Sequence, residues 1–125
     1  MPKIYKASLI ENKWTNIEEL PCNSDNFSTS HPALSEDGLK LYFASNRPIS
    51  KDSTNTKDFD IWYVQRSELH AEWSEPINLG APVNSELDEF FPSVANSKNL
   101  YFTMVKKELE SEDDIFMCEW KIHDD

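Results

Sequence analysis

Asp88 and Glu89 are neighbouring carboxylates, a pair that can do chemistry when it lies at the mouth of a channel. Such a pair can bind a cation, or act as a general acid and base when one member holds a proton. The alternative is structural, with Asp88 capping a turn and Glu89 exposed to solvent. The sequence leaves both interpretations open.

His31 is the second candidate, because a histidine at a channel mouth can change its charge near neutral pH or ligate a metal ion. The structural alternative is a hydrogen bond from its ring to a neighbouring loop. His70 and His123 fall elsewhere in the repeat pattern described below, so no three ligands converge. We therefore predict no metal site and no cofactor.

Arg47 lies across one predicted loop from Asp58 and Asp60. A salt bridge that closes this loop is the expected role of the arginine, and recognition of an anion is the alternative. Asn84, the last candidate binding residue, lies in the polar loop that ends at Glu89. The predicted binding residues are His31, Arg47, Asn84, Asp88 and Glu89.

Motifs of nucleophilic and metal-dependent catalysis are missing from the sequence, which has no G-x-S-x-G, no H-E-x-x-H and no glycine-rich phosphate loop. The acidic residues 108–114 lack the alternating ligands of a calcium loop, which favours a solvated loop. Cys22 and Cys118 are far apart and are expected to be free thiols. We predict that the chain has no catalytic residues of its own.

Length and charge narrow the partners further. The chain has 125 residues, of which 38% are hydrophobic and 12% aromatic, enough for one folded domain. A formal net charge of −11 repels phosphate backbones, so nucleic acid is not expected as a partner. No run of about 18 apolar residues is present, and residues 1–10 lack the basic start of a signal peptide. We expect no membrane insertion.

The elements that must position these residues are revealed by an internal repeat with a period near 60. Four sets of residues recur: 14–20 as 73–79 at an offset of 59, 31–34 as 91–94 at 60, 41–43 as 100–102 at 59, and 60–62 as 114–116 at 54. Pro21, Asn23 and Ser24 recur as Pro82, Asn84 and Ser85 at an offset of 61. Offsets that change only between motifs indicate repeated strands joined by loops of variable length.

Each recurring motif is short, rich in aromatic and β-branched residues, and bounded by turn-forming residues, which is typical of a strand. Helices are nearly absent from the pattern. Asp37-Gly38 between two apolar runs predicts a hairpin, because Gly38 accepts positive φ without a steric penalty. The nine expected strands cover residues 3–10, 13–20, 31–35, 40–45, 60–66, 72–79, 90–95, 99–105 and 114–122.

The segments 31–48, 58–64, 73–85 and 88–94 resemble the TolB-type WD-like β-propeller repeats of bacteria. The resemblance covers about residues 3–118, with two departures: residues 95–99 replace the usual Ser-Pro-Asp-Gly turn, and the loop after Pro48 lacks the frequent glycines. It implies an all-β partial propeller of about 2.25 four-stranded antiparallel blades. Residues 3–20 then supply strands three and four of a preceding blade, 31–79 a complete blade and 90–122 an incomplete one.

This arrangement places the long polar loops 21–30, 46–59, 80–89 and 106–113 on one rim. Binding residues usually lie on loops held by a rigid scaffold, so this loop-rich rim is the predicted functional surface. Trp14 and Trp73, at equivalent positions of outermost strands, are expected to pack between sheets or to cover an edge. Closure needs roughly four blades or more, so we expect missing blades from a longer chain, self-assembly or an open arc.

The resemblance implies a non-catalytic binding or scaffold module that docks a protein or an envelope polymer on the loop-rich rim. The alternative is the propeller portion of a hydrolase or polysaccharide lyase whose catalytic residues lie largely outside this chain. The family suggests a periplasmic or extracytoplasmic location, whereas the chain shows no export signal. Fold alone does not decide between these functions.

Overall fold

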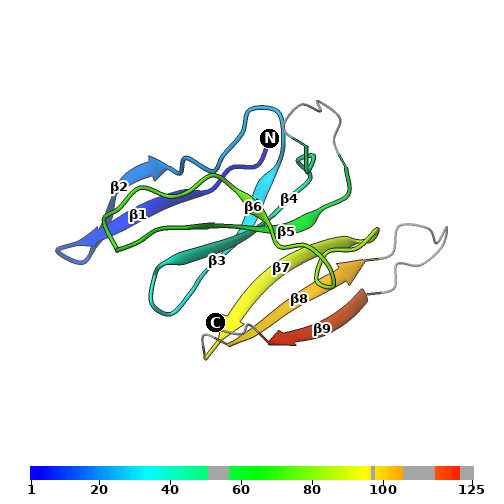
Figure 1. The fold of residues 1–125 in the computed structure, drawn as a ribbon. Helices are drawn as coiled ribbons and strands as arrows, with labels where there is room; N and C mark the ends of the chain where they lie inside the picture. The colour runs from blue at the N-terminus through cyan, green and yellow to red at the C-terminus, as the bar shows by residue number, and fades with distance from the viewer. Residues whose placement is uncertain (51–56, 97, 106–114, 122–125) are drawn as a thin grey trace.

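The computed structural model describes residues 1–50, 57–96, 98–105 and 115–121, and these residues form an all-β structure (Figure 1). The strands are β1 (Tyr5–Ile10), β2 (Lys13–Glu19), β3 (Thr29–Leu34), β4 (Lys40–Ser45), β5 (Asp60–Gln65), β6 (Ile77–Asn78), β7 (Asp88–Ala95), β8 (Asn99–Val105) and β9 (Ile115–Lys121). Within the described ranges, no helix has the length and apolar character needed to cross a membrane.

Three antiparallel sheets contain these strands, in the orders β1-β2, β3-β4-β5-β6 and β7-β8-β9. We call them the first, second and third sheet. The second lies between the other two, and the first and third lie at opposite sides of the molecule (Figure 1). The predicted all-β class is confirmed, and β4 and β8 have the predicted bounds.

The predicted strand over residues 72–79 is wrong in its length, because only Ile77–Asn78 is a strand. Ser74 still lies beside β5: its backbone N–H donates to the Gln65 carbonyl at 2.8 Å, and its hydroxyl accepts from the Gln65 N–H at 3.0 Å. Pro76 follows two residues later and has no N–H to donate to a ladder. The segment therefore follows β5 without forming a continuous strand.

The internal repeat extends to the backbone dihedral angles. The pairing of β3 with β4 changes register between Ser30 and Ala33, and that of β7 with β8 changes register between Phe90 and Ser93. Inside each irregularity one residue before a proline has positive φ, 54° at His31 and 53° at Phe91. Positive φ is uncommon outside glycine, so its recurrence at an offset of 60 is a structural feature that the two repeated motifs share.

Hydrophobic side chains of β4 and β5 are buried on both faces of the second sheet, which explains the continuous apolar runs in these strands. Since successive side chains point to opposite faces, the runs divide into two clusters. Leu41, Phe43, Trp62 and Val64 pack with Ile4 and Cys22 beside the first sheet. Tyr42, Ala44 and Ile61 pack with Val83, Leu100 and Phe102 beside the third sheet.

Trp73 and Trp14, which were expected to have equivalent roles, differ in the structure. Trp73 is half-buried against the cluster of Ile4 and Cys22, as expected for packing between sheets. Trp14 is 72% exposed on β2, so it does not pack between sheets. The cause is its place on the outward face of the first sheet, which the second sheet does not cover.

Candidate functional site

Loops that precede β3 and β7 lie against the loop that follows β4, at one end of the sheets. The Ser28 backbone N–H donates to Asn46 Oδ1 at 2.9 Å, which joins the connector 21–30 to the end of β4. The Phe59 N–H donates to Asp88 Oδ1 at 2.8 Å, which joins the first residue of β7 to the loop before β5. These contacts agree with the predicted loop-rich rim, while the predicted loop 106–113 lies outside the described residues.

Two asparagine side chains hold these connectors to the strands. The amide of Asn23 accepts from the Ile4 N–H at 2.8 Å and donates to the Ile4 carbonyl at 2.7 Å. Asn84 makes the same pair of hydrogen bonds to Ile61, at 2.7 and 2.8 Å, and also donates to Asn78 Oδ1 at 2.9 Å. We call each arrangement an amide clamp. Asn84, one of the predicted binding residues, therefore fastens the connector before β7 to the backbone of β5.

Glu89 and Asp60 form a buried carboxyl pair between the second and third sheets, with exposed fractions of 0% and 1%. Glu89 accepts from the Ser85 hydroxyl at 2.7 Å and from the Ser85 N–H at 3.1 Å. Burial raises the pKa of Glu89 to about 7, and the neighbouring charge of Asp60 acts in the same direction. Glu89 is thus buried rather than solvated, and the solvated alternative for this residue is wrong.

Lys57 supplies a positive charge beside Asp60 and Asp58. Its Nζ lies 2.6 Å from Asp58 Oδ1 and 2.7 Å from Asp60 Oδ2. Asn78 Nδ2 donates to the same Asp60 oxygen at 2.9 Å, whereas Asp60 Oδ1 is buried and has no hydrogen-bond partner among the described residues. Protonation of Glu89 removes the repulsion between the two neighbouring carboxylates, which is the direction in which the pKa of Glu89 is raised.

The expected salt bridge of Arg47 with Asp58 and Asp60 is wrong, because Lys57 takes both carboxylates. The guanidinium of Arg47 instead lies between the first and second sheets. Its Nη2 donates to the Cys22 carbonyl and to Thr29 Oγ1, both at 2.8 Å, and its Nε donates to Ser45 Oγ at 2.9 Å. Burial lowers the pKa of Arg47, although an arginine keeps its charge throughout the physiological range.

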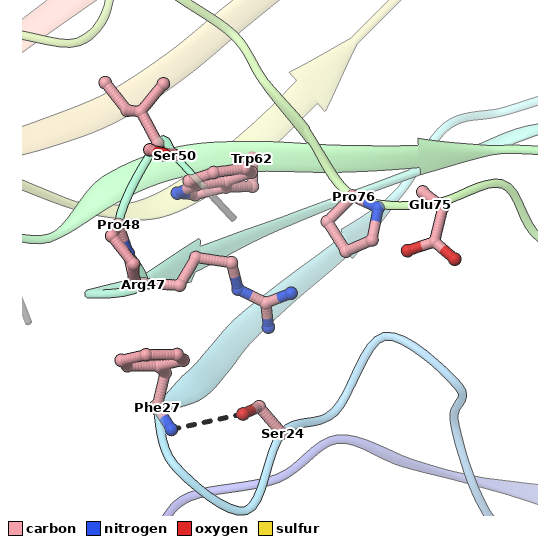
Figure 2. A pocket seen from close by; sticks show the side chains of 9 residues that line it. Ser24, Phe27, Arg47, Pro48, Ser50, Trp62, Glu75 and Pro76 are labelled. Carbon is pink, nitrogen blue, oxygen red and sulfur yellow. Dashed lines mark hydrogen bonds between the residues drawn. The ribbon is translucent and has the colours of Figure 1, made fainter. Parts of the chain in front are cut away.

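Arg47 also lines a cleft of about 290 Å³ beside the second sheet (Figure 2). Its Cζ lies 5.3 Å from the ring centroid of Phe43 and 5.7 Å from that of Trp62, within the range of a cation–π contact. Trp62 is 5% exposed, and its Nε1–H has no acceptor in the described part of the chain. The cleft is lined by Ser24, Phe27, Arg47, Pro48, Ile49, Ser50, Trp62, Glu75 and Pro76.

His31 lies away from this cleft and packs on the third sheet. Its ring centroid is 4.1 Å from that of Phe91 and 5.6 Å from that of Phe90, the second contact being edge-on. Burial lowers the pKa of His31, which favours the neutral ring at pH 7. Ser30 Oγ lies 3.4 Å from its Nδ1, so the ring contacts its own strand and an adjacent sheet.

The structure therefore distributes the five predicted residues over three places. Asn84, Asp88 and Glu89 lie together at the junction of the second and third sheets, where Asp88 is 8% exposed. Arg47 lies in the cleft, and His31 lies on β3. Sequence reasoning missed Phe27, Trp62 and Pro76 as lining residues, since no motif or spacing joins them.

Among residues that the structure describes, no group of three or more His, Cys, Asp and Glu side chains is arranged to hold a metal ion. The carboxyl groups of Glu89 and Asp60 are buried and closed to solvent. Comparison with known proteins returned no matching family model, curated protein or solved structure. The cleft is the part of this site that is open to a partner.

Proposed function

We propose that this chain is a non-catalytic binding module that docks an extended protein segment in the cleft beside Arg47. We further propose that its sheets are successive blades of a TolB-type β-propeller arrangement, about 2.25 blades in all. Two observations support that arrangement: the sheets have two, four and three antiparallel strands, and the second and third sheets carry the same backbone irregularity at an offset of 60.

The observation that carries the binding proposal is the composition of the cleft. Aromatic and proline side chains provide flat apolar walls: Phe27, Trp62, Pro48 and Pro76. Grooves of this kind bind extended, proline-containing segments, which lose little conformational entropy on docking. Trp62 is 5% exposed, so its contribution to the cleft is the ring that forms part of the apolar wall.

Charges in the cleft suit a protein segment better than an anionic polymer. Arg47 and Glu75 both line it, and the attraction between them opposes the effect of burial on the pKa of Arg47. An acceptor near Arg47 and a basic side chain near Glu75 would match this arrangement, whereas a chain of like charges would be repelled by one of the two residues. We therefore assign the cleft to a peptide and treat binding of an envelope polymer as the competing outcome.

The test is binding of a library of proline-containing 12-residue peptides, compared with purified peptidoglycan, to the wild-type chain and to Ile49→Asp. Ile49 lines the cleft and is 65% exposed, so the substitution should leave the fold intact. We expect selected peptides to bind, with affinity reduced about tenfold in the variant, equivalent to about 1.4 kcal/mol.

The matched control is Leu69→Asp, a change of the same kind at a loop residue that is 55% exposed and does not line the cleft. This control should bind the selected peptides as the wild type does. Binding of peptidoglycan alone, or equal losses in Ile49→Asp and Leu69→Asp, would contradict the proposed docking of a peptide in the cleft.

A further inference from the structure

The outward face of the first sheet is apolar and exposed. Tyr5 and Leu9 on β1 are both 56% exposed, and Trp14 on β2 is 72% exposed. Leu9 and Trp14 are directly paired across the strands, and Tyr5 shares the face of Leu9 because the side-chain period of a strand is two. We call these three residues the leading face. Contiguous exposed apolar patches of this kind mark interaction sites more often than ordinary surface.

The repeat identifies which residues of the second sheet match the leading face. The amide clamps align Ile4 with Ile61, and the Leu20 N–H donates to the Ile4 carbonyl just as the Leu79 N–H donates to the Ile61 carbonyl. Tyr5 therefore matches Trp62. The residues that pair with them in the neighbouring strands also match. Tyr5 pairs with Glu19 and Trp62 pairs with Asn78, and Glu19 and Asn78 are themselves 59 residues apart in the sequence.

In the second sheet the matching positions are covered. Trp62 is 5% exposed and packs in the cluster that contains Ile4 and Cys22 of the preceding unit. Trp73, which matches Trp14 at an offset of 59, is half-buried against the same cluster. The leading face of the first sheet therefore corresponds to a face of the second sheet that another sheet covers.

The third sheet presents the other half of such a contact. Tyr101 of β8 matches Tyr42 of β4 at an offset of 59. Tyr42 faces the third sheet, where it packs with Leu100 and Phe102, and Tyr101, which lies between those two residues in β8, is on the opposite face of the third sheet. Tyr42 is 3% exposed because the third sheet covers it, whereas Tyr101 is 37% exposed. We call the side of the third sheet that carries Tyr101 the trailing face. It lies on the far side of the molecule from the first sheet (Figure 1).

We propose that the leading face of one copy of this chain binds the trailing face of a second copy. The chain already contains this kind of contact twice, between the first and second sheets and between the second and third. The trailing face of a second copy is therefore the kind of surface that covers such a face elsewhere in the repeat. The two faces differ, so the contact is head-to-tail and each copy keeps one free face for a further copy.

The net charge of −11 on every copy opposes this association at low salt. Screening shortens the range of the repulsion to about 10 Å at 0.1 M salt and about 3 Å at 1 M. Association should therefore strengthen as sodium chloride is raised, as expected for an apolar contact between like-charged molecules. An interface held by surface ion pairs would weaken instead.

The experiment is sedimentation velocity of the full chain from 5 to 500 μM, with two variants that each block one face. Leu9→Lys with Trp14→Glu blocks the leading face, and Tyr101→Lys blocks the trailing face. The wild type should exceed the monomer mass as concentration rises, and each variant alone should stay monomeric. An equimolar mixture should form a one-to-one dimer, because each variant supplies the face that the other lacks.

Ile49→Asp is the control, since it lies in the cleft and outside both faces, and it should associate as the wild type does. A wild type that is monomeric at every concentration, or a mixture that stays monomeric, would overturn the proposal. Association of either variant alone would overturn it too, because it requires contacts between like faces. Far-ultraviolet circular dichroism verifies folding, and Tyr5→Lys and Tyr101→Ser replace any variant that fails it.

Discussion

The junction between the first and second sheets and the junction between the second and third share one frame. Each has an amide clamp, from Asn23 at the first junction and from Asn84 at the second. Each also has a backbone bond from the next strand, Thr29 N–H to the Pro2 carbonyl at 3.0 Å and Glu89 N–H to the Phe59 carbonyl at 2.8 Å. The frame depends on backbone groups and on one asparagine, so it tolerates different side chains around it.

The chemistry within that frame is opposite at the two junctions. Where the first junction has Lys3 and Thr29, the second has Asp60 and Glu89 at the matching positions. Thr29 accepts a hydrogen bond from Arg47, which lines an open cleft, whereas Glu89 and Asp60 are fully buried. A small number of side chains therefore decides whether a junction is cationic and open or acidic and closed.

The largest expected effect comes from removing the shared frame with Asn84→Ala. This change leaves the buried Ile61 N–H without its acceptor and removes three hydrogen bonds, so we expect a loss of roughly 3 kcal/mol in the free energy of unfolding. Asn23→Ala should cost roughly 2 kcal/mol by the same mechanism, because it removes two such bonds. Urea unfolding measures both values.

Asn26→Ala is the control for the clamps, because Asn26 is exposed in the same connector as Asn23 and only its backbone N–H has a described hydrogen bond. Its unfolding midpoint should stay near that of the wild type. Clamp variants as stable as this control would show that the shared frame does not hold the junctions together.

The frame was partly predictable from the sequence. Asn23 and Asn84 recur at an offset of 61, and most strands lie where alternation and turn residues place them. Gly38 has φ of 78° in the hairpin that Asp37-Gly38 predicts. Spacing does not name a partner, however, so it could not show that each asparagine bonds to an isoleucine backbone about 20 residues away in the chain.

The buried carboxyl pair gives the next effect, a dependence of stability on pH at the second junction alone. With the pKa of Glu89 raised to about 7, the folded state holds a proton that the unfolded state releases above about pH 4.5. The contribution of Glu89 to stability should therefore be complete below about pH 4.5 and be lost as pH rises through about 7. Glu89→Gln should match the wild type at pH 5 and exceed it by on the order of 2 kcal/mol at pH 8.

Thermal unfolding between pH 5 and pH 8 measures this difference. Glu86→Gln, an exposed residue of the same connector, should keep the pH dependence of the wild type. A Glu89→Gln variant whose midpoint falls with pH as steeply as that of the wild type would show that another group titrates, and the contrast between the junctions would lose its electrostatic basis.

The cleft could not be predicted, although Arg47, one of the predicted binding residues, is among the residues that line it. Its lining comes from the connector before β3, the end of β4, the middle of β5 and the segment before β6, which only the stacking of the sheets brings together. The choice of Asp58 and Asp60 as partners of Arg47 was wrong because Lys57, next to Asp58 in the chain, reaches both. Local spacing could not rank two cations that compete for the same carboxylates.

The smallest expected effect on stability is that of changing Lys3. In the first junction Lys3 occupies the position that Asp60 occupies in the second junction. Lys3 Nζ lies 2.7 Å from Asp25 and 3.1 Å from Glu19, and the hydrogen bond to Asp25 raises the pKa of the lysine. Asp25 is 88% exposed on its side chain, so solvent and salt screen this contact. Lys3→Met should leave the urea midpoint unchanged, while Asp60→Asn, which alters the buried partner of Lys57 and Asn78, should shift it. Equal shifts for the two variants would mean that the open and closed junctions do not differ in the way their charges are buried.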